Sequence, residues 1–409
     1  MPADHKAHRS ESSGAVHGVR NPALRHVLTH LITPLLMCVG MGLAYMGAFV
    51  APEPHHLPVA VVGAGPEAKV FAQTVKDKAG DALDVRTLDS RPAAVEQLRS
   101  RDIDGAYVLS VKSPELIVAT AGSDMSAITA EKIFTPVATQ QGVPLKVTDV
   151  TPTVSDDPTG QGLFFLLVAL SIGSYASVAV VGAAGSALSM RTRAALVVGV
   201  SGVVGLVGAA LAGPVFHLAH HGLWGMWAMS WLYSAGILFI GVGLHTFLKR
   251  WTTLALMVLF VMLNFTSSGG LYRPELQNGF FGTLHSFWNG ASFVEGSRSL
   301  LYFGSHDLAR NVWTLAVWLV VGLVVTGLAA LTERRRGAAA VEPRQQDPHG
   351  VAQAPARSAR SEAEEAEEAE EAEEAEEAEE AQEAQESEAA EAAEAAEEEM
   401  EEMEETVAV

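Results

Sequence analysis

Long apolar runs alternate with polar segments along the 409-residue chain, and their spacing is uneven. One run covers about residues 27–50, a mostly polar stretch follows at 51–161, and five more runs lie between Leu163 and Leu331. Each run approaches or exceeds the roughly 20 apolar residues that an α-helix needs to cross a bilayer. The pattern predicts a polytopic α-helical membrane protein with six transmembrane helices, helix 1 at 27–50 and helices 2–6 within 162–332.

The polar stretch between helices 1 and 2 has the pattern of a small α/β domain. Apolar strands at Leu57–Val62, Asp84–Leu88, Asp104–Val111, Glu115–Thr120 and Val143–Val150 are interleaved with helical segments at Pro66–Lys78, Pro92–Ser100 and Ser123–Thr139. Strands that alternate with helices are typical of an α/β fold. Among its acidic residues we expect Asp81, Asp84, Asp89, Asp102 and Asp104 to form a solvated surface.

Four clusters of basic residues flank the apolar runs, and all four fall on the same side of the membrane if all six runs span. They precede run one (Lys6, Arg9, Arg20, Arg25), separate runs two and three (Arg191, Arg193), separate runs four and five (Lys249, Arg250), and follow run six (Arg334, Arg335, Arg336). Because positive charge is retained in the cytoplasm, this side is predicted to be inside. The protein is then a multi-pass protein of the cell membrane with both termini cytoplasmic, an N-terminal segment at 1–26 and an extracytoplasmic α/β domain at 51–161.

The formal net charge of −21 is confined to one segment. Residues 361–409 hold 25 acidic residues and no basic one, which leaves 23 of the 48 acidic residues against all 27 Lys and Arg, a net charge of +4, for residues 1–360. We expect 333–360 to be a cytoplasmic linker and 361–409 an acidic Glu/Ala-rich low-complexity tail, disordered or a fluctuating helix. The single cysteine, Cys38, excludes an intrachain disulfide and is expected to be a small buried apolar residue.

Three sequence features bear on whether the chain binds a cofactor, a metal or a driving ion. Gly63-Ala64-Gly65 nearly spells a dinucleotide fingerprint, but a strand-to-helix turn needs glycine for steric reasons alone, so no cofactor is expected. His217, His220 and His221 would share one helical face, which permits a metal site but favours a polar cap. Asp and Glu are absent from the six runs, which argues against an ion-driven secondary transporter, although backbone carbonyls or hydroxyls remain possible Na⁺ ligands. No metal and no catalytic residue is predicted.

The segment between runs five and six is too polar to span and too aromatic for a plain loop. It contains Gly269, Gly270 and Pro274, then aromatic residues, then Glu295 and Arg298. We interpret 267–305 as an external re-entrant segment and as the candidate translocation region, in which Glu295 and Arg298 pair at i, i+3 at the solvated outer rim. An interfacial aromatic belt is the alternative.

Three stretches carry a resemblance to a family. They are Asn21-Pro22-Ala-Leu-Arg25 with Leu57-Pro58-Val-Ala-Val-Val62, the layout of one span, a domain and five spans, and Ser267-Ser268-Gly269-Gly270 with Pro274 and Gly296-Ser-Arg298. Together they resemble the membrane subunit, or permease, of a type-2 ABC exporter, in the YhgE/Pip-like branch. The resemblance implies homo- or heterodimers of permeases whose cytoplasmic turns dock on a separate P-loop ATPase subunit. The candidate docking segments are Asn21–Thr29 and the turn Ser186–Arg193, which includes Arg191 and Arg193.

The functional prediction combines these observations. We expect the permease subunit of an ATP-driven exporter that moves a hydrophobic or amphipathic substrate out of the cell. The chain contains no Gly-x-x-x-x-Gly-Lys-Ser/Thr loop, so it is not predicted to be an enzyme. Its expected partners are the ATPase, a second permease and the lipid bilayer, with no nucleic acid. A membrane-anchored interaction or receptor protein that acts through its external domain is the main alternative, and a secondary transporter is the third.

Overall fold

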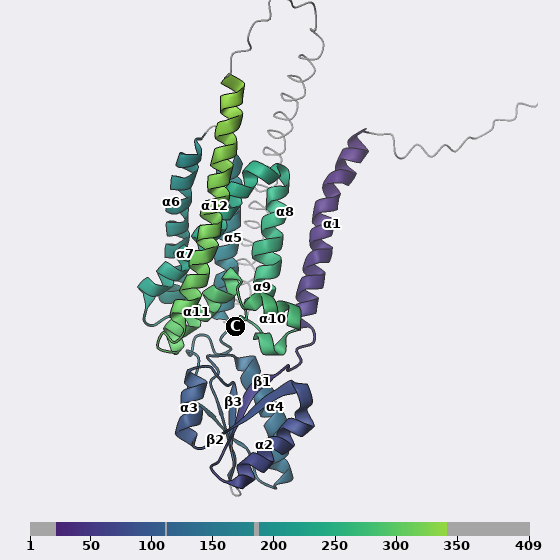
Figure 1. The fold of residues 1–409 in the computed structure, drawn as a ribbon, viewed down its shortest axis with the longest axis vertical. Helices are drawn as coiled ribbons and strands as arrows, with labels where there is room; N and C mark the ends of the chain where they lie inside the picture. The colour runs from purple at the N-terminus through teal and green to yellow at the C-terminus, as the bar shows by residue number, and fades with distance from the viewer. Residues whose placement is uncertain (1–21, 111–112, 184–187, 342–409) are drawn as a thin grey trace, which may run out of the picture. The chain divides into compact units, whose positions relative to one another are not determined.

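The structure is a computed structural model that describes residues 22–110, 113–183 and 188–341 (Figure 1). Predictions for residues 1–21, for most of the linker and for the acidic tail lie outside these residues. Within them, five helices are long and apolar enough to cross a membrane, which is consistent with a polytopic helical membrane protein. They are α1 (Pro22–Phe49), α5 (Gly162–Ala183), α6 (Met190–Ala210, continued by the π-turn Leu211–Val215), α7 (Leu223–Leu248) and α12 (Leu308–Val341).

The predicted fifth span differs from the other five. Residues Thr252–Ser267 form an apolar helix that is shorter than the 18 residues of a candidate span. It follows the 3-10 turn η4 (Lys249–Trp251) and consists of α8 (Thr252–Met257), the π-turn η5 (Val258–Met262) and α9 (Leu263–Ser267). A six-span topology is therefore not established by helix length. At the other end of the chain, α12 continues to Val341, beyond the boundary at 332 predicted from apolar character.

Close helix packing in the bundle depends on glycines. A Cβ at Gly243 would lie 2.7 Å from the backbone nitrogen of Thr326 on α12, and one at Gly205 would lie 3.0 Å from the backbone of Trp231 on α7. The hydroxyl of Thr326 donates a 2.7 Å hydrogen bond to the carbonyl of Phe239. Small residues let the backbones approach closely enough for such contacts.

The polar stretch forms the predicted α/β domain. A five-stranded sheet has the order β2-β1-β3-β4-β5, parallel except for the antiparallel pair β3–β4. The strands are β1 (Leu57–Val62), β2 (Leu83–Leu88), β3 (Gly105–Val108), β4 (Glu115–Val118) and β5 (Lys146–Asp149). Its helices are α2 (Pro66–Ala79, followed by η1, Gly80–Ala82), α3 (Arg91–Arg99) and α4 (Asp124–Gln140).

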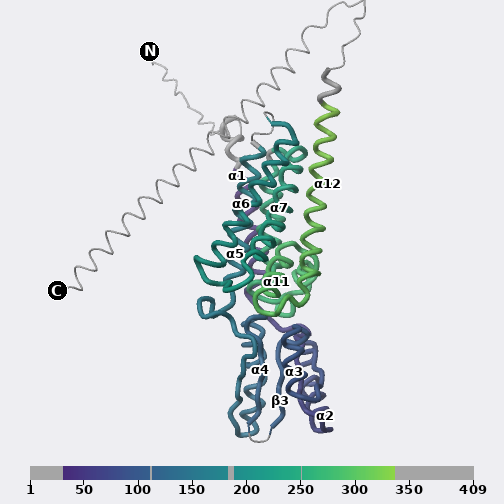
Figure 2. Tube along the Cα trace, turned by 90° about the vertical axis from the view of Figure 1, so that its left-hand side faces the viewer, coloured from purple at the N-terminus to yellow at the C-terminus, as the bar shows by residue number. Residues whose placement is uncertain are grey.

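Alternate residues of the central strands divide the core of this domain into two layers. Val59, Tyr107 and Leu116 pack in one layer with Phe134 of α4 and Val75 of α2. The next residue along each of these strands points to the other face of the sheet and packs in the layer that contains α3. Figures 1 and 2 show α3 on one side of the sheet and α4 on the other. Every strand and helix predicted here from the sequence is present, with boundaries that agree to within a few residues.

Two expectations about single residues were wrong. Cys38 is exposed on the outer face of α1 rather than buried, because α1 uses only a few residues, such as Ala44 and Ala48, to contact the rest of the chain. His217, His220 and His221 do not share a helical face, because the helical backbone ends at Val215 and His217 has a φ of 51°. Among the described residues no group of His, Cys, Asp and Glu has a metal-binding arrangement.

Candidate functional site

The segment after α9 is broken into short helices because its residues cannot continue one. Gly269 has a φ of 71°, which ends the helical path, and Pro274 begins the single turn η6 (Pro274–Leu276). Asn278 then caps α10 (Gly279–His285) through hydrogen bonds from the backbone N–H groups of Phe280 and Phe281. The longer α11 (Asn289–Tyr302) follows and is buried along nearly its whole length.

Glu295 and Arg298 of α11 form the predicted i, i+3 ion pair. Arg298 Nη1 lies 2.8 Å from Glu295 Oε1 and donates a 2.9 Å hydrogen bond to the carbonyl of Gly269, while Nη2 donates to the carbonyl of Gly270 at 3.2 Å. The Arg298 side chain is only 4% exposed. The pair is therefore not at a solvated rim: it ties α11 to the two glycine carbonyls of the break after α9.

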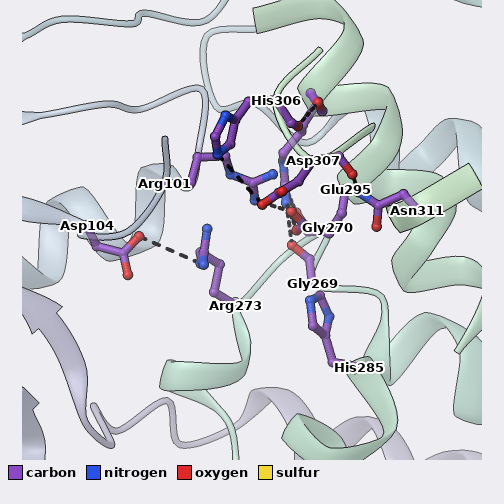
Figure 3. Close-up of polar contacts among 12 residues, drawn as sticks. Arg101, Asp104, Gly269, Gly270, Arg273, His285, Glu295, His306, Asp307 and Asn311 are labelled. Atoms are coloured by element: carbon purple, nitrogen blue, oxygen red, sulfur yellow. Dashed lines mark hydrogen bonds and ion pairs between the residues drawn. The ribbon is translucent and has the colours of Figure 1, made fainter. Parts of the chain in front are cut away.

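The α/β domain contributes two more charged side chains to the same place. Arg101, which precedes β3, pairs with Glu295 Oε2 and lies over the ring of Phe303 with its Cζ 5.3 Å from the ring centroid. Asp104 lies 3.7 Å from the Nε atom of Arg273. Figure 3 shows these side chains pointing toward one another from the two parts of the chain. We call the set Arg101, Asp104, Arg273, Glu275, Glu295 and Arg298 the charged junction.

Backbone contacts reinforce the charged junction. The N–H of His55, which lies between α1 and β1, donates a 2.7 Å hydrogen bond to the carbonyl of Glu275. The Glu275 carboxylate in turn accepts a 3.3 Å bond from Arg273 Nε. The short path from α1 into the α/β domain is therefore fixed to the turn η6 by a backbone hydrogen bond, next to the side-chain pair of Arg273 and Glu275.

Burial dominates the electrostatics of Asp104. Its side chain is 8% exposed, and this burial raises the pKa of the carboxyl to about 6, against the field of Arg273, which lowers it. The Oδ2 atom of Asp104 has no hydrogen-bond partner within the described part of the chain. The expectation of a solvated Asp104 was wrong, because the turn before β3 faces the broken segment, not water. Asp81 and Asp89 are exposed as expected.

A small polar hollow, with room for about one water molecule, adjoins the charged junction. Its wall combines the start of α4 (Ser123, Asp124) and the loop before α5 (Gly160, Gln161) with Arg298 of α11. Burial raises the pKa of Asp124, and the nearby Asp149 carboxylate raises it further. The hollow gives solvent a route to the edge of an otherwise buried cluster.

At the opposite end of the bundle a buried arginine pairs with a half-buried glutamate. Arg193 of α6 is 4% exposed and lies 2.7 Å from Glu333 of α12, whose carboxylate also accepts a 3.0 Å hydrogen bond from Thr246 of α7. The Glu333 carboxylate therefore joins three helices, and Arg193 is paired inside the bundle, whereas Arg191 is exposed. Asn21 and residues 186–187 of the predicted docking turn lie outside the described residues.

The sequence identified two of the six members of the charged junction, Glu295 and Arg298, together with the glycines that Arg298 binds. Gly269, Gly270, Glu295 and Arg298 are in contact, and Pro274 follows the paired Arg273. Arg101, Asp104, Arg273 and Glu275 were missed. The available signal was Arg273-Pro-Glu275, an opposite-charge pair inside an otherwise aromatic segment.

The comparisons with known proteins leave the family open. No protein-family model matches the sequence, and no curated protein or solved structure matches it. Function must therefore be argued from the site.

Proposed function

We propose that this chain is the permease subunit of an ATP-driven exporter of the type-2 ABC class. In this proposal Thr252–Ser267 completes a set of six spans, both termini are cytoplasmic, and the α/β domain is outside the cell membrane. A hydrophobic or amphipathic substrate leaves through a dimer of permeases, and ATP is hydrolysed on a separate subunit. The arginines beside the apolar runs and the family resemblance support this orientation.

The observation that carries the proposal is the charged junction. Arg101 of the α/β domain and Arg298 hold Glu295 between them, and Arg298 also holds the Gly269 and Gly270 carbonyls. A broken helix is tolerated at membrane depth only where protein or a water-filled path covers its backbone. Breaking and re-forming these contacts would let the α/β domain open and close the broken segment, as an outward-facing gate requires.

The rival is a receptor that uses the bundle as an anchor and the α/β domain to bind a partner. An anchor needs neither a broken, buried helix nor polar groups inside its bundle, because each costs free energy in lipid. The charged junction makes sense in a receptor only if partner binding is meant to alter the bundle. We therefore rank the receptor second.

Reconstitution with an ATPase tests the proposal. The full chain would be co-expressed with a soluble P-loop ATPase encoded beside it, purified, and assayed for ATP hydrolysis in lipid nanodiscs. We expect co-purification, and we expect Arg191→Glu to weaken it, because Arg191 is exposed at the predicted docking turn. Arg86→Glu, an exposed charge reversal in the α/β domain, is the matched control and leaves binding unchanged. If no ATPase binds and deletion of 57–155 alone abolishes the cellular activity, the receptor is correct instead.

A further inference from the structure

Neutral polar side chains from three helices meet inside the bundle. Asn264 of α9 donates through Nδ2 to the hydroxyl of Tyr233 on α7 at 2.6 Å, and that hydroxyl lies 2.5 Å from Ser171 Oγ on α5. All three side chains are fully buried. The amide oxygen of Asn264 has no hydrogen-bond partner among the described residues.

The position of these residues along their helices places them deep in the bundle. Ser171 is the tenth residue of α5 and Tyr233 the eleventh of α7, counted from the ends that lie beside the α/β domain. At a rise of about 1.5 Å per residue, both lie about 15 Å from those ends. A hydrocarbon core is roughly 30 Å thick, so the polar set lies near its middle.

The first turn of α11 packs against this polar set. A Cβ at Gly290 would overlap the amide oxygen of Asn264, so the Asn264 side chain is pressed onto the first turn of α11. No side chain caps α11, and the first backbone hydrogen bond in the helix runs from the N–H of Ser292 to the carbonyl of Trp288. Where the structure describes the chain, the N–H groups of Asn289, Gly290 and Ala291 have no acceptor.

The side chain of Asn289 adds two more unsatisfied atoms. It is 1% exposed, and in the described part of the chain neither its amide nitrogen nor its amide oxygen has a partner. A buried helix start normally finds side chains, water or a ligand for its donors, since an unpaired polar group buried away from water is destabilising. This helix start has none of the usual caps, although Ser189, Ser123 and Asn278 cap α6, α4 and α10.

We propose that the N-terminus of α11, with Asn289 and Asn264, binds an oxyanion, a carboxylate or phosphate group carried by an amphipathic molecule. The unpaired groups are mainly N–H donors, and the positive end of a helix dipole favours negative charge. Acceptor oxygens on the ligand would satisfy several donors at once, while Asn264 Oδ1 accepts from a hydroxyl or protonated oxygen. A metal cation is disfavoured here, because the N–H groups and the helix dipole both present positive charge to the site.

The site rests on the proposed function for its meaning, because it identifies the substrate class of the exporter as acidic amphiphiles. Its depth suits a headgroup that must pass the middle of the membrane while its chains stay in lipid. Binding itself needs no ATPase, so the site and the exporter can fail separately. If the chain binds an ATPase but does not bind anionic amphiphiles, the proposed function stands and the oxyanion site is wrong.

A ligand panel on the wild-type chain provides the first test. The full chain in nanodiscs of zwitterionic lipid would be titrated calorimetrically with short-chain phosphatidic acid, a short fatty acid, short-chain phosphatidylcholine and inorganic phosphate. We expect the two anionic amphiphiles to bind at least tenfold more tightly than phosphatidylcholine and inorganic phosphate. If phosphatidylcholine bound as tightly as the anionic amphiphiles, the site would not select an oxyanion and the proposal would be wrong. If inorganic phosphate bound as tightly, the site would not select an amphipathic ligand.

A pair of isosteric variants provides the second test. Asn289→Asp places a negative charge at the start of α11, where the helix dipole tolerates it, and should weaken binding of phosphatidic acid at least tenfold. Asn278→Asp makes the same change at the exposed cap of α10 and should leave binding unchanged. Unchanged binding in Asn289→Asp, with a thermal melt matching the wild type, contradicts the proposal.

Discussion

The charged junction and the polar set inside the bundle solve the problem of buried polarity in opposite ways. At the charged junction, three arginines and three carboxylates neutralise one another, and Arg298 also binds two backbone carbonyls. Inside the bundle, Ser171, Tyr233, Asn264 and Asn289 carry no charge and leave some atoms unpaired. Compensated charge thus joins the α/β domain to the bundle, and neutral hydrogen-bonding groups form the set inside the bundle.

The difference follows from the cost of burial. A lone charge in an apolar interior costs far more than a lone amide, so buried charges persist only in compensated sets. An unpaired amide destabilises the fold much less, and it remains available to bind a ligand. The charged junction is therefore expected to act in cohesion between the two parts, and the interior set in recognition.

Removing one member of the charged junction should give the largest effect. Glu295→Ala leaves Arg101 and Arg298 buried without their shared partner, and we expect a loss of about 3–5 kcal/mol in the free energy of unfolding. Asp84→Asn removes the exposed pair with Arg86 as a matched control and should cost under about 1 kcal/mol. Chemical unfolding in detergent measures both. A Glu295→Ala loss as small as that of the control would mean that the charged junction does not hold the two parts together.

The charged junction should also respond to pH through Asp104. Its pKa is raised to about 6 from an ordinary value of 3.8, so the folded state binds the proton more tightly than the unfolded state does. This contribution to stability is present in full below pH 3.8 and is lost as the pH rises through about 6.

Asp104→Asn removes this proton-binding group with almost no change of shape. The difference in stability between variant and wild type should therefore grow by up to about 3 kcal/mol in favour of the variant between pH 4 and 7. Thermal melts across that range measure the difference. Parallel pH profiles would show that Asp104 titrates as an ordinary carboxyl.

Two buried tyrosines differ in whether the hydroxyl group has a hydrogen-bond partner. Tyr233→Phe removes the hydroxyl that bonds Asn264 and Ser171, and we expect a loss of about 1–2 kcal/mol. Tyr107 in the α/β domain is equally buried, but its hydroxyl has no partner among the described residues, so Tyr107→Phe should be neutral or slightly stabilising. Equal losses in the two variants would indicate that ring packing, not hydrogen bonding, controls both sites.

The sequence predicted the α/β domain well because each element is specified locally. Leu57–Val62 is a continuous apolar strand, and Pro66 and Pro92 begin helices in the first-turn position that proline prefers. The i, i+3 spacing likewise predicted the pair Glu295–Arg298. These signals lie within a few residues of one another.

Contacts across the fold could not be predicted in the same way. Arg101 and Glu295 are 194 positions apart, and nothing near Asp104 distinguishes it from its exposed neighbour Asp102. Burial of Asp104 depends on where the turn before β3 meets Arg273, which only the folded chain defines. The uncapped start of α11 was equally invisible, because Trp288-Asn289-Gly290 lacks any pattern that marks an empty cap.

The helix α12 links the two ends of the bundle mechanically. Its first turn packs on α11, where a Cβ at Gly296 would lie 3.1 Å from Asn311, and Glu333 near its other end holds Arg193. The 22 residue steps from Asn311 to Glu333 belong to one continuous helix and span about 33 Å. Such a helix behaves as a lever: a tilt of about 5° at Asn311 displaces Glu333 by roughly 3 Å, enough to separate an ion pair of ordinary length.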